Sequence, residues 1–214
     1  MQPFLLTLVA STATLALATA ADTSDGFHDL RLGYGIAEKS YDASVDNGLN
    51  SEDLDQAWDS NHRAFALYVG SFGGTRFGGI AFGADLVANF RDVDSDDSSA
   101  EIEYESYGAH VYLGWALPIG TSFQLELLPF FGAAAAELTR TLPGGTSTSD
   151  NQTTFEFGAD LNAIVTLGRF QLGAQLGYLI EDTRFNVNNG IDDREYDFSG
   201  GSFIGSVMVG YRIF

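Results

Sequence analysis

The side chains best able to do chemistry in this sequence are a few charged residues that stand among glycine and alanine in otherwise apolar segments. They are Asp85, Arg91, His110, Glu126, Glu156, Asp160, Arg169 and Arg212. Such groups must pair when they are removed from water, so we expect a polar network of ion pairs and hydrogen bonds in the interior of the fold. A gated polar path is the alternative, because acids outnumber arginines four to three in this set and leave a carboxylate that could hold a cation or a proton.

A second candidate site is an acidic segment that could bind a metal. Asp92, Asp94, Asp96 and Glu103 offer oxygens at a spacing similar to that of a calcium loop, and hard cations take six to eight oxygen ligands. Position six of the segment is Asp97, where a calcium loop requires glycine, and the flanking segments are strands rather than helices. A solvated acidic loop is therefore the preferred interpretation.

Alternation with a period of two indicates the elements that carry these residues. Apolar and small or polar residues alternate clearly through residues 77–91, 102–117, 153–167 and 169–184, whereas the faces of 62–72 are ambiguous. The same pattern predicts eight strands, at 27–38, 62–72, 77–91, 102–117, 122–139, 153–167, 169–184 and 201–214. The fold class is therefore all-β, and the charged residues fall on the more polar face.

The connections between these strands alternate between short and long. Residues 73–76, 118–121 and 168–169 form tight turns that use glycine and proline and contain no acid. The longer links, 39–61, 92–101, 140–152 and 185–200, are polar, and the first, second and fourth are rich in Asp and Glu. An up-and-down arrangement places the long acidic links at one end of the molecule and both termini at the other.

Composition excludes several classes of protein. The formal net charge is −19 and the chain has a single lysine, so it lacks the basic clusters that nucleic-acid binding requires. There is no cysteine for disulfides, and a hydrophobic content of 45% argues against disorder. Residues 1–20 carry no charge and end in small residues, which predicts a signal peptide and a single mature domain at 21–214.

Even strand number, short turns at one end and long links at the other are the layout of an outer-membrane barrel. With the final residues Val207–Phe214 ending in an aromatic side chain, the sequence resembles the small bacterial outer-membrane β-barrel proteins, a group that includes the OmpA membrane domain, OmpX, OmpW and the opacity proteins. The fold implied is an eight-stranded antiparallel up-and-down transmembrane β-barrel with long acidic extracellular loops and short periplasmic turns. In the last strand we expect Val207, Val209, Tyr211 and Ile213 to face outward.

The resemblance implies location in the outer membrane of a Gram-negative bacterium, with lipopolysaccharide and other outer-membrane lipid around the barrel. It implies that Phe214 is read by the barrel assembly machinery, and that the acidic loops carry a structural or surface role and contact an extracellular partner. No nucleic acid and no cofactor are expected. Enzymatic barrels of this size use a His-x-Ser pair, but Leu30, Ala64 and Tyr112 stand two positions after the three histidines, so we expect no enzyme activity.

Two other functions remain open from the sequence. The OmpW branch implies passage of small hydrophobic molecules, and Leu128, Phe130, Leu179 and Ile204 could line an apolar path if they face inward. A soluble lipocalin-like ligand carrier in the periplasm would show the same alternation with its faces reversed, apolar inside and polar outside.

Overall fold

The computed structural model describes residues 26–37, 42–46, 51–53, 58–75, 78–93, 100–188 and 193–213. Its strands are β1 (His28–Ala37), β2 (Asp42–Asp46), β3 (Ser51–Asp53), β4 (Trp58–Thr75), β5 (Gly78–Val93), β6 (Glu101–Ile119), β7 (Phe123–Thr141), β8 (Ser147–Leu167), β9 (Phe170–Asn188) and β10 (Asp193–Arg212). In the described part of the chain, no helix is long and apolar enough to cross a membrane.

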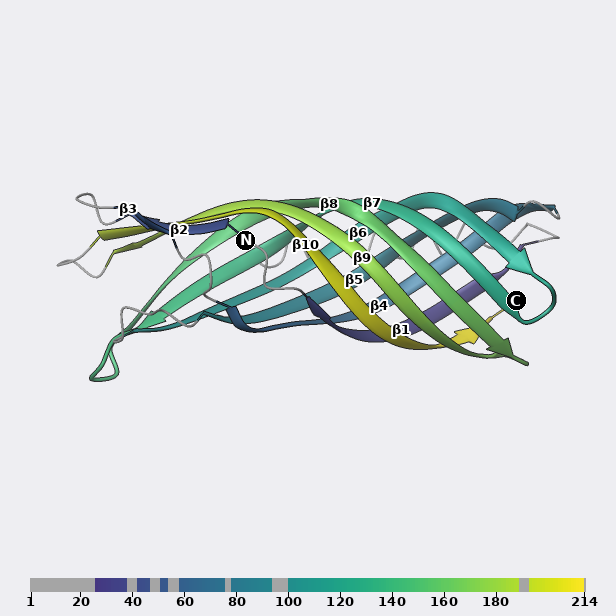
Figure 1. Cartoon of the computed structure of the whole chain (residues 1–214), viewed down its shortest axis with the longest axis horizontal. Coiled ribbons are helices and arrows are strands. Elements are labelled where there is room, and N and C mark those ends of the chain that lie inside the picture. Colours follow the sequence, from purple (N-terminus) through teal and green to yellow (C-terminus); the bar gives the residue numbers. More distant parts are fainter. Residues whose placement is uncertain are drawn as a thin grey trace.

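Eight of the strands form one closed antiparallel ring, in the order β1, β4, β5, β6, β7, β8, β9 and β10. The ring closes between the first and last of them, where Asp29 is the register partner of Arg212 and Ala37 that of Ile204. The strands wind obliquely around the barrel axis, as Figure 1 shows. This confirms the prediction of an eight-stranded up-and-down barrel.

The β2–β3 hairpin extends the ring at one end. Beyond the last β1 pair, β10 takes β2 as its neighbour instead, with Ser199 opposite Asp42 and Glu195 opposite Asp46. Figure 1 shows this hairpin at the end of the barrel away from the C-terminus. Within the described residues β3 pairs with β2, and no pairing joins it to β4.

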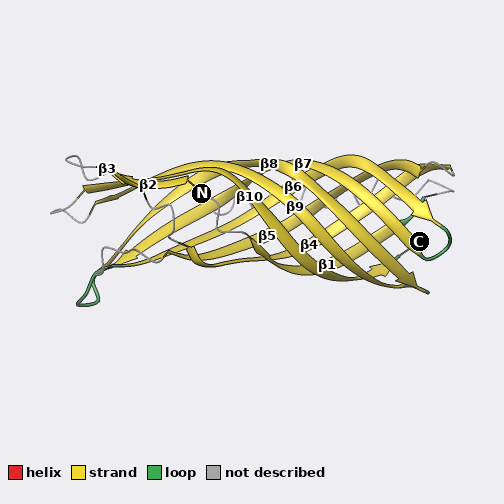
Figure 2. Ribbon diagram, viewed as in Figure 1, coloured by secondary structure: helices red, strands yellow, loops and turns green. Residues whose placement is uncertain are grey.

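The strands are longer than the sequence predicted, and the long links are correspondingly shorter. The predicted link at 140–152 is a tight turn, in which the Leu142 N–H donates to the Thr146 carbonyl at 2.9 Å and Gly144 and Gly145 have φ of 114° and 83°. Figure 2 shows this turn at the opposite end from the turns after β6 and β8. Most of the predicted link at 185–200 likewise belongs to β9 and β10.

The prediction ended the strands too early for a physical reason. The expected pattern required apolar residues on the outer face, which a strand shows only where lipid surrounds it. Beyond the level of the lipid, the outward side chains become polar, whereas the inward side chains still pack against one another in an apolar cluster. Phe185 and Phe198 therefore point inward and are fully buried, between exposed or half-buried polar neighbours such as Arg184 and Asp197.

The outer face of the ring is a band of exposed apolar side chains. Leu113, Phe170 and Val207 are 68%, 69% and 69% exposed, whereas charged residues at the same levels point inward. Val209 and Tyr211 also face outward, as predicted for the last strand. A lipocalin-like carrier requires the opposite arrangement, so that alternative is wrong.

The interior holds two apolar clusters as well as charged groups. The central cluster resolves the ambiguous strand, because Phe65, Leu67 and Val69 of β4 point inward. The outer cluster lies in the part of the wall beyond the apolar band. Its members are Ile102, Tyr104, Ala136, Leu138, Phe185, Val187, Tyr196 and Phe198.

Candidate functional site: the polar lumen

The candidate site is the interior of the ring, where every strand contributes inward side chains at alternate positions. The inward series has odd numbers on β1, β4, β5 and β9 and even numbers on β6, β7, β8 and β10. Most of its charged members form three groups along the barrel, which we call the periplasmic, central and outer networks. A further buried arginine, Arg140 of β7, is the register partner of Ile102 in the outer wall.

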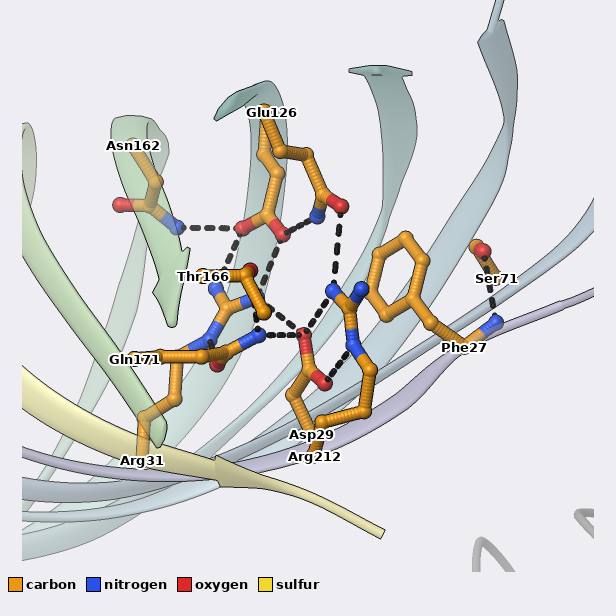
Figure 3. Close-up of polar contacts among 10 residues, drawn as sticks. Phe27, Asp29, Arg31, Ser71, Glu126, Asn162, Thr166, Gln171 and Arg212 are labelled. Atoms are coloured by element: carbon orange, nitrogen blue, oxygen red, sulfur yellow. Dashed lines mark hydrogen bonds and ion pairs between the residues drawn. The ribbon is translucent and has the colours of Figure 1, made fainter. Parts of the chain in front are cut away.

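The periplasmic network is centred on Arg31 of β1 (Figure 3). The Arg31 guanidinium donates to both carboxylate oxygens of Glu126 on β7, at 2.6 and 2.7 Å, and to Asp29 at 2.8 Å. Arg212 donates to the other side of Asp29 at 2.9 Å, and the Gln171 amide donates to it at 2.7 Å. Because β1 and β7 lie on opposite sides of the ring, this network crosses the lumen.

The central network surrounds His110 of β6. Its Nδ1 lies 2.8 Å from Asp85 on β5 and its Nε2 lies 2.6 Å from Glu156 on β8. Asp85 also accepts the Tyr112 hydroxyl at 2.7 Å and a longer contact from Arg63 at 3.5 Å. All of these side chains are buried, and the imidazole joins carboxylates of two strands that are not neighbours in the ring.

A glycine gives His110 the space to cross. Gly132 on β7 stands directly opposite His110, between the two strands that supply the carboxylates. A Cβ at Gly132 would lie 2.3 Å from the His110 Cδ2 atom and 2.2 Å from the Ala109 carbonyl oxygen. The imidazole therefore lies directly over the backbone of Gly132, and any larger residue at this position would require His110 or the backbone to move.

The outer network is one ion pair beneath the outer apolar cluster. Arg91 of β5 donates from both terminal nitrogens to the two carboxylate oxygens of Glu181 on β9, across the ring. The Arg91 guanidinium also lies over the Tyr104 ring, 4.6 Å from its centroid. Tyr104 in turn packs edge-on against Phe185 and Phe198, so the ion pair and the aromatic cluster lie against each other at this level.

These networks fill the lumen with ion pairs and hydrogen bonds between strands. Buried ions are tolerated only when they are paired and hydrogen-bonded, and here the pairs bridge opposite walls. Both ring nitrogens of His110 face carboxylates, so neither can take a proton from a serine or water nucleophile. His28 and His62 instead contact the hydroxyls of Tyr68 and Tyr34, at 2.7 and 2.8 Å.

The structure brings most of the predicted lumen residues into these networks. The residues that point into the lumen are Asp85, Arg91, His110, Glu126, Glu156, Asp160 and Arg212. Arg169 does not: it is exposed in the turn between β8 and β9, where its guanidinium lies 3.4 Å from the Tyr211 hydroxyl. The prediction failed there because alternation cannot be extrapolated from a strand into a turn.

Four important lumen residues were not predicted: Asp29, Arg31, Arg63 and Glu181. Arg63 has the same parity as Phe65, so its inward direction depended on resolving the ambiguous faces of β4. Asp29 and Arg31 alternate with the exposed residues Leu30 and Leu32. This alternation indicates that they point inward, but it extends over only a few residues of the sequence. Glu181 has an odd number, as the inward residue Gln171 of the same strand has, so the alternation along β9 could have predicted that Glu181 points inward.

The acidic segment after β5 is only partly described. Asp92 and Glu103 are direct register partners on β5 and β6, and both are exposed. Asp94 and Asp96 lie outside the described residues, as does Phe214. Among the residues that the structure describes, no group of three or more acidic or histidine side chains is placed to hold a metal ion.

Comparison with known proteins supports the fold. No protein-family model matches the chain, and no curated protein matches it. Among solved structures it is similar to the outer membrane protein OprG from Pseudomonas aeruginosa, with 14% identity over 89% of this chain and 97% of that one and a TM-score of 0.56.

More distant similarity extends to two other barrels. One is Ail of Yersinia pestis, with 17% identity over 88% of this chain and 99% of that chain and a TM-score of 0.44. The other is Neisserial surface protein A, with 13% identity over 86% of this chain and 96% of that chain and a TM-score of 0.44. The closed ring of eight strands and the similarity to OprG show that the chain has the fold of a small outer-membrane β-barrel. Its apolar outer face and closed ring place it in the outer membrane, since a closed ring leaves no unpaired backbone in lipid.

Proposed function

We propose that this protein is a sealed, non-catalytic barrel of the outer membrane, and that its function is to present a rigid acidic wall outside the membrane to a basic partner. Lipopolysaccharide would surround the apolar band, and the assembly machinery would read the C-terminal strand. The observation that carries the proposal is that the strands continue past the apolar band as a packed wall rather than as loops.

The outer wall has an acidic outer face on neighbouring strands. Its exposed carboxylates on β5, β6 and β7 include Asp92, Glu101, Glu103, Glu105 and Glu137. Asp92 stands directly opposite Glu103, and Glu105 directly opposite Glu137, so like charges are cross-strand neighbours. Such pairs destabilise a sheet, and a positively charged partner would relieve the repulsion.

The wall is also stiff enough to act as a recognition surface. Behind the carboxylates, Tyr104, Phe185 and Phe198 are fully buried and in mutual edge contact. On the far side of the same wall, exposed Arg184 binds Asp197 at 2.8 Å and Glu195 at 3.0 Å, and the hydrogen bond to Asp197 raises the pKa of Arg184. The carboxylates of β10 are thus paired with an arginine, whereas Glu105 of β6 accepts a hydrogen bond from the neutral Tyr107 hydroxyl at 3.0 Å. We propose that the β6–β7 carboxylates serve a basic partner.

Binding of an oligolysine peptide to the barrel in a zwitterionic detergent tests this function. Replacing Glu103, Glu105 and Glu137 by glutamine should weaken binding about tenfold or more at low salt, with the difference shrinking as salt is raised. A matched control, Glu195→Gln with Asp197→Asn, should bind as the wild type does. Equal binding by all three proteins would contradict the proposal.

Passage of small hydrophobic molecules is the second candidate function. Leu128, Phe130, Leu179 and Ile204 all point inward and belong to the central apolar cluster, and within the described residues no strand pairing joins β3 to β4 in the outer wall. The Arg91–Glu181 pair lies between this cluster and the outer one, so a permeant would have to pass an ion pair. Phe130→Asp should reduce uptake of a hydrophobic fluorophore into vesicles, and unchanged uptake would reject this function.

A further inference from the structure

Asp160 differs from the other fully buried carboxylates of the lumen. Asp29, Asp85, Glu126, Glu156 and Glu181 each contact an arginine or His110, whereas no residue of the described chain forms an ion pair with Asp160. Asp160 is 0% exposed and accepts a hydrogen bond from the neutral amide of Gln175, at 3.0 Å to Oδ2. The Tyr112 hydroxyl, which donates to Asp85, also lies near Asp160, and Arg63 and His110 act on it only from beyond ion-pair distance. Its Oδ1 atom has no hydrogen-bond partner.

The central network therefore lacks one positive charge. In the periplasmic network Arg31 and Arg212 balance Asp29 and Glu126, and in the outer network Arg91 balances Glu181. In the central network His110 can donate to two carboxylates only as the imidazolium, because a neutral ring has a single N–H. Even then His110 and Arg63 leave one negative charge of Asp85, Glu156 and Asp160 uncompensated.

Two amide oxygens near Asp160 also lack donors. The Gln175 nitrogen is held by Asp160 and the Asn162 nitrogen by Glu126, at 3.0 Å in each case, which fixes both amides with their oxygens turned away from these bonds. Neither Gln175 Oε1 nor Asn162 Oδ1 has a hydrogen-bond partner, and both residues are buried. Figure 3 shows the Asn162 oxygen on the side away from Glu126.

These residues are neighbours in the wall. Asn162 and Gln175 are direct register partners on β8 and β9, and Asp160 is the register partner of Gly177. Asp160 Oδ1 lies over bare backbone there, because a Cβ on Gly177 would be 2.5 Å from it. The lumen side of β8 and β9 thus combines a missing positive charge with acceptor oxygens that have no donor.

We propose that Asp160, Gln175 and Asn162 form a buried site for a hard monovalent cation of the sodium class. All of the candidate ligands are oxygens, which such cations prefer over nitrogen or sulfur. A single positive charge neutralises the central network, whereas a divalent ion would leave it with an excess of the opposite sign. The cation would tie β8 to β9 inside the lumen and complete the seal at this level.

Thermal unfolding of the full-chain barrel in detergent tests the site. The wild-type midpoint should be higher in sodium chloride than in N-methyl-D-glucamine chloride at equal ionic strength, and should rise by about 3 to 5 °C for each tenfold increase in sodium above the dissociation constant. Asp160→Asn should abolish this difference. Asp182→Asn, which removes an exposed carboxylate from β9, should preserve it.

A second measurement keeps the proposal testable if Asp160→Asn does not fold. Gly177→Ala places a methyl group against the Asp160 side chain, whose free end can shift while the backbone stays in place. Broadening of the ²³Na resonance by the folded wild type should be lost in Gly177→Ala and retained in Asp182→Asn. Equal broadening by all three proteins, or a wild-type midpoint that depends on pH but not on the cation, would overturn the proposal.

Discussion

Arg31 and Glu126 form a bidentate ion pair across the lumen, from β1 to β7, with hydrogen bonds of 2.6 and 2.7 Å and both side chains fully buried. The strands that carry them lie on opposite sides of the ring, so the pair restrains the barrel across its diameter as well as filling it. Charged residues in a barrel wall thus act here as part of the core.

The Arg31–Glu126 pair predicts an asymmetric response to mutation. Arg31→Ala leaves buried Glu126 and Asp29 without their shared arginine and should lower the free energy of unfolding by about 3–5 kcal/mol. Arg31→Met combined with Glu126→Leu should cost much less than Arg31→Ala. Urea unfolding of the refolded barrel in detergent measures both, and Arg184→Ala, which removes an exposed arginine, should cost no more than about 1 kcal/mol. Equal losses for Arg31→Ala and Arg184→Ala would show that the pair is not buried.

The absence of side-chain space at Gly132 predicts another stability difference. Gly132→Ala should destabilise the barrel by about 1–3 kcal/mol, because the methyl group would force His110 and the Ala109 backbone apart. Gly205→Ala is the matched control, since a Cβ at this outward glycine of β10 meets no atom within 4 Å. Urea unfolding compares the two variants, and similar midpoints would contradict the observed placement of His110.

The apolar outer face predicts a cost for charge within the lipid. Leu113→Arg should lower the free energy of unfolding in lipid vesicles by about 2–4 kcal/mol, the cost of an arginine near the bilayer midplane. Thr153→Arg, on the polar outer face of β8, should have little effect. If Leu113→Arg were as stable as the wild type and soluble without detergent, the membrane assignment would fail.

The proposal of a sealed lumen predicts low conductance. In planar bilayers the wild-type barrel should pass no steady current, because ion pairs span the ring at the periplasmic and outer levels and His110 joins two carboxylates between them. Removing both cross-lumen arginines, with Arg31→Ser and Arg91→Ser, should raise conductance measurably if the double variant folds on a heat-modifiability gel. Arg169→Ser with Arg184→Ser removes two exposed arginines, and this double variant should pass no steady current. A steady wild-type current would contradict the sealed interior.

Heat modifiability is the simplest check that underlies all of these experiments. The refolded chain should migrate faster before boiling than after it, because a closed ring of paired strands resists detergent. Circular dichroism of the same sample should show β structure and no helix. A sample without a mobility shift would be unsuitable for the variant comparisons and would contradict the closed ring.

The amino-acid sequence by itself was sufficient for the fold class, the strand number and the facing of most strands. These depend on local alternation, which a strand shows wherever one face meets lipid and the other meets the lumen. The same reasoning gave the inward direction of His110 and Glu126. It failed at Arg169, which lies in a turn, and it ended the strands too early, because the outer wall carries no apolar band.

Only the tertiary structure decided which charged residues pair, because the partners come from strands far apart in the sequence. Parity places Arg31 and Glu126 on the inside, but the registers of four successive strand pairs decide whether they share a level of the barrel. A shift of one residue in any register would turn a side chain to the other face. For the same reason, alternation alone cannot show that Asp160, unlike the other fully buried carboxylates, forms no ion pair within the described residues.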